Sequence, residues 1–374
     1  MIRYLFCHLT RLERKRGPDI MGKLLETIIV TFLGGILFSL LHLPLSWMLG
    51  PLTAVLLWQG FTKRTLAWPV GLRNGGLVLL GYSMGLAFTA ESARQIVTQL
   101  PSMLAATVLT IGFSVLSAYA ISRRSGISLP SGIIGSIPGG LSQMVVLSEE
   151  IENADQTVVA FMQTIRLLSV IFVVPFLAVH GLAGGAATGA LPPQTGAAIF
   201  ASISWWTAIL IAALVLAAAW LAVKLKLPTP WFLGPITVAA VLTICGWAPP
   251  HLPSPLILAA QWSLGIYLGL GIKFSALAGW RRLLPYSLAG GVAIVAFSLA
   301  LSFGFSLIQP ISVVTAFLST SPGGMTEMGV TASAVHADVS MVVAYQMFRI
   351  LFILFIVPYF LRWALKGRLK TGES

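Results

Sequence analysis

Charged side chains are scarce in this chain. Asp, Glu, Lys and Arg account for 9% of its 374 residues, whereas hydrophobic residues account for 57%. A soluble domain carries about 25% charged residues, so this chain cannot cover a water-exposed surface with polar groups. The mean hydropathy of +0.91 is typical of a membrane protein. Because lipid offers no partner to backbone N–H and C=O groups, we expect an all-α polytopic membrane fold.

Residues that carry chemistry are scarce as well. The two cysteines stand in unrelated contexts, which excludes a disulfide framework. The five histidines include no pair three or four residues apart, so a ligand set for metal-dependent oxidation is lacking. The sequence contains no Walker loop, nucleophile elbow or dinucleotide fingerprint. We therefore predict no enzymatic activity, no cofactor and no metal site.

Acidic residues are outnumbered by basic ones, 11 against 23, which gives a net charge of +12. Most basic residues flank apolar segments, and a cluster at each end of the chain is typical of cytoplasmic anchors under the positive-inside rule. Neither tail is long enough for a folded DNA-binding module. A direct nucleic-acid partner is therefore not expected.

The chain does contain an internal repeat, at an offset of 184 residues. The segment 43–53, LPLSWMLGPLT, returns as 227–237, LPTPWFLGPIT, with seven identical positions. Further along, the offset becomes 183 residues, and Asp155 matches Asp338. Solenoid repeats have periods of about 20 to 50 residues, so this repeat indicates two homologous halves of one membrane domain.

The basic residues predict how these halves cross the membrane. We predict about ten transmembrane helices, five per half, plus one interrupted segment in each half. Lys63 and Arg64 follow the first Trp-x-Leu-Gly-Pro helix, but no Lys or Arg lies at 246–254 after its second copy. The copies are therefore expected to be inverted. The predicted organisation is a cytoplasmic basic tail (1–22), membrane repeat 1 (23–180), a Gly/Pro-rich linker (181–197), membrane repeat 2 (198–364) and a cytoplasmic tail (365–374).

Each half carries a Pro-Gly-Gly motif within an apolar stretch, Pro138-Gly139-Gly140 and Pro322-Gly323-Gly324. Proline removes a backbone donor and glycine weakens a helix, so we expect two half-helices that meet at a break. The N-terminus of a half-helix can bind an anion or a polar ligand. Ser142 and Thr326 would add hydroxyls there. The alternative is that both motifs are kinks that only allow close helix packing.

The last helix of each repeat carries one arginine, and the two arginines match each other in the repeat. A charge facing lipid would cost at least about 2.5–3.5 kcal/mol, so Arg166 and Arg349 should face the protein interior. Gln163 and Gln346 precede them by three residues and share their helical face. Together they suit a bidentate contact to an anionic ligand. Alternatively, the arginines are architectural and neutralise carbonyls at half-helix ends.

One position breaks the symmetry of the two halves, because Glu327 matches Gln143. A single protonatable carboxylate suits proton or cation coupling at an asymmetric site. A purely structural hydrogen bond is the alternative. Asp155 and Asp338 open the final helices and are interpreted as N-caps.

The paired Trp-x-Leu-Gly-Pro segments, with Ile-Pro-Gly-Gly-Leu-Ser-Gln-Met and Ser-Pro-Gly-Gly-Met-Thr-Glu-Met, resemble the membrane AbrB family. The resemblance covers about residues 25 to 365 and implies an internal duplication. Family members carry labels as regulators of gene expression and as ammonia monooxygenase-like proteins. Neither label follows from the residues of this chain.

The sequence predicts an inner-membrane, transporter-like protein with both termini in the cytoplasm. Its partners are a small solute, for which an anion suits the arginines, and the lipid bilayer, and the oligomeric state is left open. One alternative is a membrane sensor or regulator that acts indirectly on gene expression, and the weakest is a metal-dependent monooxygenase. The predicted solute-binding residues are Pro138, Gly139, Gly140, Ser142, Gln143, Gln163, Arg166, Pro322, Gly323, Gly324, Thr326, Glu327, Gln346 and Arg349.

Overall fold

The structure, a computed structural model, describes residues 17–182, 205–247, 249–272 and 283–361. Within these ranges every regular element is a helix, as the composition predicts. The first half contains α2 (Gly17–Leu40), α3 (Ser46–Thr62), α4 (Val70–Gly85), α5 (Ala90–Thr98), α6 (Leu100–Ser125), α7 (Leu129–Ser136), α8 (Leu141–Glu150), α9 (Gln156–Phe176) and the π-helix η1 (Leu177–Leu182). The second half contains α11 (Trp205–Lys224), α12 (Pro230–Ile244), α13 (Ser254–Gly271), α14 (Leu284–Ile308), α15 (Val313–Thr320), α16 (Met325–Ala334) and α17 (Val339–Phe355).

Five of the described helices are long and apolar enough to cross a bilayer. They are Met21–Leu40, Leu100–Ser125, Gln156–Leu182, Trp206–Lys224 and Leu284–Ile308. The apolar helices α12 and α17 contain 15 and 17 residues, fewer than the roughly 20 that usually span the hydrocarbon. A membrane protein is thus supported, while the count of ten transmembrane helices remains a prediction.

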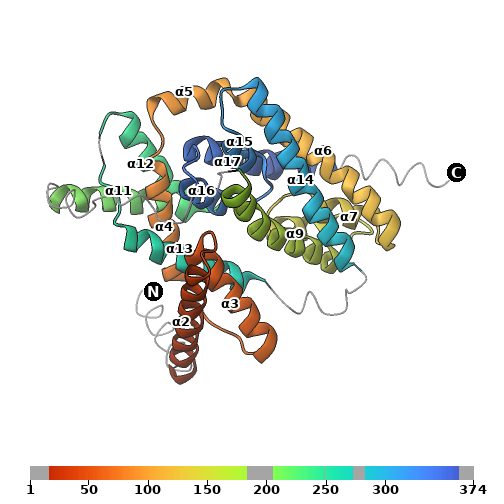
Figure 1. The fold of residues 1–374 in the computed structure, drawn as a ribbon, viewed down its shortest axis with the longest axis horizontal. Coiled ribbons are helices and arrows are strands. Elements are labelled where there is room, and N and C mark those ends of the chain that lie inside the picture. Colours follow the sequence, from red (N-terminus) through yellow and green to blue (C-terminus); the bar gives the residue numbers. More distant parts are fainter. Residues whose placement is uncertain (1–16, 183–204, 248, 273–282, 362–374) are drawn as a thin grey trace, which may run out of the picture.

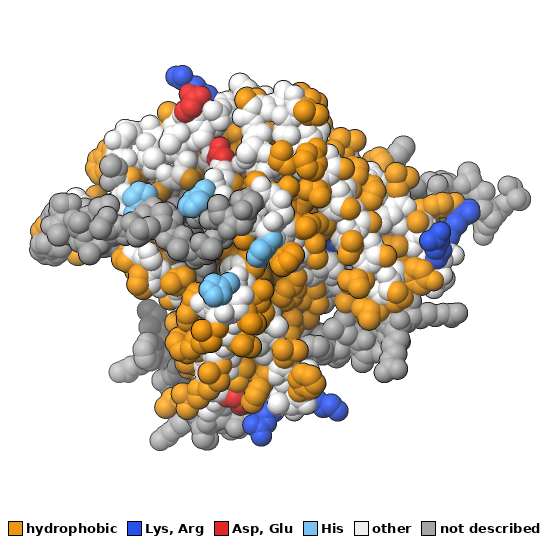
Figure 2. All heavy atoms as spheres, in the orientation of Figure 1, with side chains coloured by type: hydrophobic (Ala, Val, Ile, Leu, Met, Phe, Trp, Pro, Cys, Tyr) orange, Lys and Arg blue, Asp and Glu red, His pale blue; other side chains and the backbone are white. Residues whose placement is uncertain are grey.

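The surface of the molecule carries many hydrophobic side chains. Ile209, Leu210 and Trp220 on α11 are exposed, and so are Leu104 and Leu116 on α6. Figure 2 shows hydrophobic side chains over much of one face, whereas most of the Lys and Arg side chains in view lie at its margins. An extended apolar surface of this kind is expected where helices face lipid.

Both Pro-Gly-Gly motifs interrupt a helix, as predicted. Ile137 and Ser321, which precede the prolines, have extended backbones with ψ of 130° and 137°. A proline ring disfavours the helical conformation of the residue before it, so α7 and α15 end there. The chain re-enters a helix after Gly140 and Gly324, at the first residues of α8 and α16.

The helices pack in two groups. The first group comprises α2, α3, α4, α11, α12 and α13, and the second comprises α6, α7, α8, α9, α14, α15, α16 and α17. In Figure 1, α15, α16 and α17 lie near the middle of the view, between α4, α12 and α13 on one side and α6, α9 and α14 on the other. The two groups meet where α4 contacts α16 and α17. A buried cluster that includes Met84, Met325 and Val330 fills this seam.

Contacts within the first group occur in reciprocal pairs. A methyl group added to Gly81 would collide with the carbonyl oxygen of Phe232, and one added to Gly265 would collide with that of Met48. Gly265 follows Gly81 by 184 residues, and Phe232 follows Met48 by the same number. Small residues allow membrane helices to approach this closely. A two-fold relation between two similar units produces contacts of this reciprocal kind.

The ends of the repeats differ slightly from the predicted boundaries. Helix α2 begins at Gly17, within the segment predicted as a tail, because Pro18 lies in the first turn, where proline is tolerated. Helix α9 continues through η1 to Leu182, two residues into the predicted linker. The rest of the linker, residues 1–16 and the tail from 365 lie outside the described residues.

Candidate functional site

A central cavity of about 280 Å³ lies between the two helix breaks. Both breaks and both arginines contribute to it, and the connection before α12 closes one side. Ten of the fourteen predicted site residues line it: Pro138, Gly139, Gly140, Gln143, Gln163, Arg166, Pro322, Gly323, Gly324 and Arg349. Leu167, Pro228, Thr229, Ile350 and Ile353 complete the lining. The cavity therefore combines matching segments of the two halves.

In the second half, the final helix α17 caps the end of α15. The Gln346 amide nitrogen donates to the carbonyl oxygens of Leu318, at 2.8 Å, and Ser321, at 3.0 Å. Arg349 donates from Nη1 to Ser321 O and from Nη2 to Gly323 O, both at 2.6 Å. Nη2 also donates to Gln346 Oε1. A helix leaves its last carbonyls without partners, and these side chains provide them.

In the first half, the same arrangement is looser. The Gln163 amide donates to the carbonyl oxygens of Ile134, at 2.8 Å, and Ile137, at 2.9 Å. Arg166 Nη2 donates to Gln163 Oε1 at 2.7 Å and approaches Gly139 O at 3.4 Å. Arg166 Nε and Nη1 are buried without a hydrogen-bond partner. Arg349 thus keeps one buried nitrogen, Nε, without a partner, while Arg166 keeps two.

Three predicted site residues lie behind the cavity rather than on its wall. Thr326, Glu327 and Gln346 are buried, with Glu327 only 5% exposed. A side chain at position 324 would occupy the place of the Glu327 carboxylate, so glycine lets this carboxylate fold over the first turn of α16. A carboxylate in that position is favoured by the helix dipole. The side chain of Ser142 lies outside the described residues.

The two final helices begin as predicted. Asp155 Oδ1 accepts from the backbone N–H groups of Thr157 and Val158. Asp338 Oδ1 accepts from the N–H of Met341. Both aspartates are therefore N-caps and do not belong to the central cavity.

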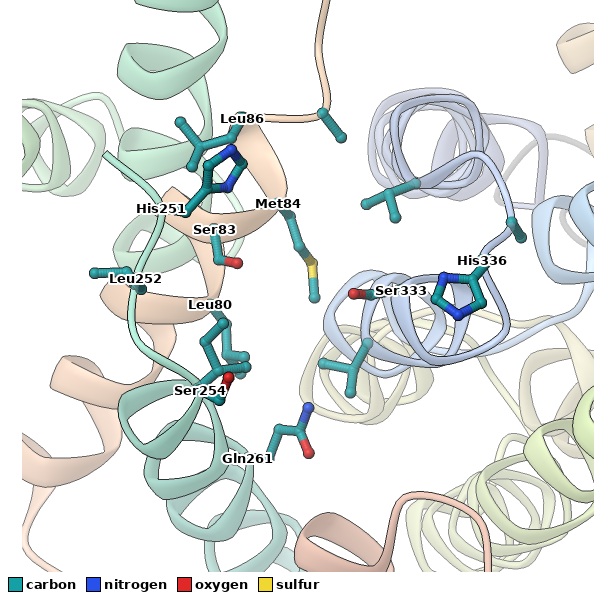
Figure 3. A pocket seen from close by; sticks show the side chains of 15 residues that line it. Leu80, Ser83, Met84, Leu86, His251, Leu252, Ser254, Gln261, Ser333 and His336 are labelled. Atoms are coloured by element: carbon teal, nitrogen blue, oxygen red, sulfur yellow. The ribbon is translucent and has the colours of Figure 1, made fainter. Parts of the chain in front are cut away.

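A second cavity, of about 370 Å³, lies between α4, α13 and the connection between α16 and α17. Figure 3 shows His251 and His336 on different walls of it, with Ser83, Ser254 and Ser333 also lining it. We call it the histidine cavity. The two histidines are 85 positions apart in the sequence, and no spacing rule for helices links them. Sequence analysis gave them no role for this reason.

Two helices connect the cavities. Thr229, which precedes α12, lines the central cavity, and His251, which follows that helix, lines the histidine cavity. On α16, Gly324 at the start lines the central cavity and Val330 lines the histidine cavity. Glu327 lies between these two positions of α16. The cavities therefore lie toward opposite ends of the seam between the two helix groups.

Comparison with known proteins identifies the family of the chain. Residues 47–365 match the model of a family described as "Transition state regulatory protein AbrB". The chain belongs to this family. It is 28% identical over 378 residues to "Uncharacterized protein YhjN" of Bacillus subtilis (strain 168), a match that covers 93% of this chain and 95% of that protein. It is also 28% identical over 344 residues to "Putative regulator AbrB" of Escherichia coli (strain K12), covering 90% of this chain and 94% of that protein. The family match confirms the predicted resemblance and includes both helix breaks and both arginines.

Proposed function

We propose that this AbrB-family protein is an inner-membrane carrier that binds a small anionic solute in the central cavity. The observation that carries the proposal is the meeting of both helix breaks at one cavity that two guanidinium groups, those of Arg166 and Arg349, also line. Broken membrane helices are tolerated where protein or a water-filled cavity satisfies their backbone. Many carriers bind their substrates at such breaks.

The proposal includes two inverted repeats that arose by duplication, with both termini in the cytoplasm. The reciprocal glycine contacts of α4 and α13 support a two-fold relation between the halves. The distribution of Lys and Arg supports inversion, since Lys63 and Arg64 lack basic counterparts in the second half. An odd number of spans in each half would produce this arrangement.

Transport would proceed by movement of one helix group against the other. Both cavities lie in the seam between the groups, so a shift there would open one cavity while closing the other. Met84 of α4 packs against Gly329 of α16 in the layer between the cavities. Glu327 lies two residues before Gly329 on α16. A protonatable group in that layer suits coupling of solute movement to protons.

The solute class follows from the lining of the central cavity. Arg166 and Gln143 supply the polar contacts, and Leu167, Ile350 and Ile353 supply an apolar wall. The volume of about 280 Å³ lies at the lower end of typical small-molecule sites. A small carboxylate or a purine fits this combination of cationic groups and an apolar wall.

A membrane sensor that binds the same solute without moving it is the second candidate. The name of the Escherichia coli relative, a regulator, favours it. Carrier and sensor share the central cavity and differ in whether the solute crosses the membrane.

A thermal-shift screen of the purified protein against a metabolite library tests the proposal. We expect a ligand that raises the unfolding temperature of the wild type and not of Arg166→Gln. Uptake of that ligand into proteoliposomes would establish a carrier, and binding without uptake would establish a sensor. If small anions stabilise wild type and Arg166→Gln equally, the central cavity is not the solute site and the proposal fails.

A further inference from the structure

A small cavity lies on α9 next to Arg166, separate from the central cavity. Its volume is about 20 Å³, and it lies among α6, α7, α9 and α14. We call it the Arg166 cavity. Space of this size accommodates a single water molecule or a monatomic ion.

Four buried polar atoms of the residues that line this cavity have no hydrogen-bond partner. They are Arg166 Nε, Arg166 Nη1, Ser136 Oγ and Ser287 Oγ. Arg166 is 8% exposed and Ser287 is 4% exposed. Buried polar groups are almost always hydrogen-bonded, so the two hydroxyls and the free guanidinium nitrogens indicate an acceptor in the cavity.

The two serines differ from most buried hydroxyls of these helices. Thr110, Ser114 and Ser169 each donate to the carbonyl oxygen four residues earlier in their own helix. Ser136 and Ser287 make no such bond, although both lie in helices. Their hydroxyl hydrogens are therefore available to an occupant of the Arg166 cavity.

The charge around this cavity is positive and uncompensated. Among the described residues, no carboxylate forms an ion pair with Arg166. Burying a charge without a partner is costly, and the guanidinium offers only donors. The hydrogens of Nε and Nη1 lie on different edges of the guanidinium, so one occupant accepts from only one of these nitrogens. A water molecule accepts at most two hydrogen bonds, whereas a monatomic anion can accept from one guanidinium N–H and from both hydroxyls, and it also neutralises the charge.

A smaller counterpart of this cavity lies next to Arg349. It is lined by Ala106, Thr107, Thr110, Ser319, Thr320, Tyr345 and Arg349, and its volume is about 10 Å³. Gly290 and Gly291 of the Arg166 cavity correspond to Ala106 and Thr107, whose side chains take up space. Arg349 has already donated to Ser321 O and Gly323 O. Arg349 Nε and Ser319 Oγ also lack a partner there, so the counterpart differs in its smaller volume and in having two such atoms where the Arg166 cavity has four.

We propose that the Arg166 cavity is a chloride site, in which the anion accepts from the Arg166 guanidinium and from the hydroxyls of Ser136 and Ser287. This site binds chloride whether or not the protein moves a solute, so its test is independent of the proposed function. Bromide, which is close in size, should bind in the same place.

The experiment compares thermal unfolding of the purified protein in chloride, bromide and gluconate at equal ionic strength. We expect the wild type to unfold at a temperature that rises saturably with chloride or bromide. Ser136→Ala and Ser287→Ala should each weaken the apparent halide affinity about tenfold, the effect of losing a hydrogen bond to a charged group. Ser319→Ala, the control at the counterpart cavity, should keep the wild-type affinity.

A variant that fills the Arg166 cavity and a crystallographic map of the bound ion complete the test. Gly290→Ala, which introduces the residue found at 106, should abolish the halide response while the protein stays folded. In crystals grown with bromide, an anomalous peak should lie against Arg166, Ser136 and Ser287. A wild type without halide dependence, an equal loss in Ser319→Ala, or a bromide map without this peak would each overturn the proposal.

Discussion

The two halves of this protein place an arginine at the same point and use it differently. Arg349 donates to two carbonyl oxygens at the end of α15 and to Gln346. Arg166 donates only from Nη2, and its Nε and Nη1 have no partner. A repeated sequence can therefore use one copy of an arginine to bind two backbone carbonyls and leave two nitrogens of the other copy without a protein partner.

The largest effect is expected for Arg349→Gln. Gly323 O would lose its donor and Ser321 O would keep only the donor from Gln346, and each unsatisfied group costs roughly 1–3 kcal/mol. We expect a loss of about 3 kcal/mol in unfolding free energy, measured by thermal unfolding in detergent. Arg166→Gln, the matched change, should cost less than about 1.5 kcal/mol because only one long carbonyl contact is lost. Equal losses in the two variants would remove the distinction between the arginines.

The sequence predicted the breaks, the buried arginines and the N-caps because each depends on local chemistry. Proline forces the break, and an aspartate at the start of a helix caps it. The difference between Arg166 and Arg349 was not predictable, because it depends on which carbonyls lie within reach across the fold. The histidine cavity depends on two connections that only the packed helices bring together, so His251 and His336 gave no signal. Glu327 was predicted from its place in the motif, but its side chain does not line the cavity.

The halves should behave alike where the fold joins them, at Gly81 and Gly265. A methyl group at either position meets a carbonyl oxygen of the facing helix, so Gly81→Ala and Gly265→Ala should each destabilise by about 1–3 kcal/mol. Gly75→Ala is the control, because nothing lies within 4 Å of a methyl group there. It should be neutral or stabilising by up to about 1 kcal/mol, since alanine favours a helix. Thermal unfolding of the three variants measures this, and a difference between Gly81→Ala and Gly265→Ala would argue against a two-fold relation.

The halves should differ again at Gln143 and Glu327. Gln143 lines the central cavity, whereas Glu327 does not. Gln143→Glu places a negative charge beside an anionic solute and should weaken its binding about tenfold, which corresponds to 1.4 kcal/mol. Glu327→Gln keeps the shape of a side chain behind the wall, so the dissociation constant should stay within about a factor of two. Ligand titrations followed by thermal shift measure both values, and tighter binding to Gln143→Glu would show that the solute is not an anion.

The smallest effect concerns the turn before each final helix, where the two halves use different residues in one conformation. His336 and Asn153 both have a positive φ, 53° and 61°. Asparagine adopts this left-handed conformation readily, whereas a β-branched residue is a strong outlier there. His336→Asn should therefore leave the unfolding temperature unchanged, while His336→Val should cost about 1–2 kcal/mol.

The asparagine variant also separates the backbone role of His336 from its place in the histidine cavity. It keeps the turn of the first half while removing the imidazole from a cavity wall. If solute uptake by His336→Asn slows while its unfolding temperature matches the wild type, the imidazole contributes to the path of the solute. If uptake and stability both match the wild type, His336 serves only the turn, as Asn153 does in the other half.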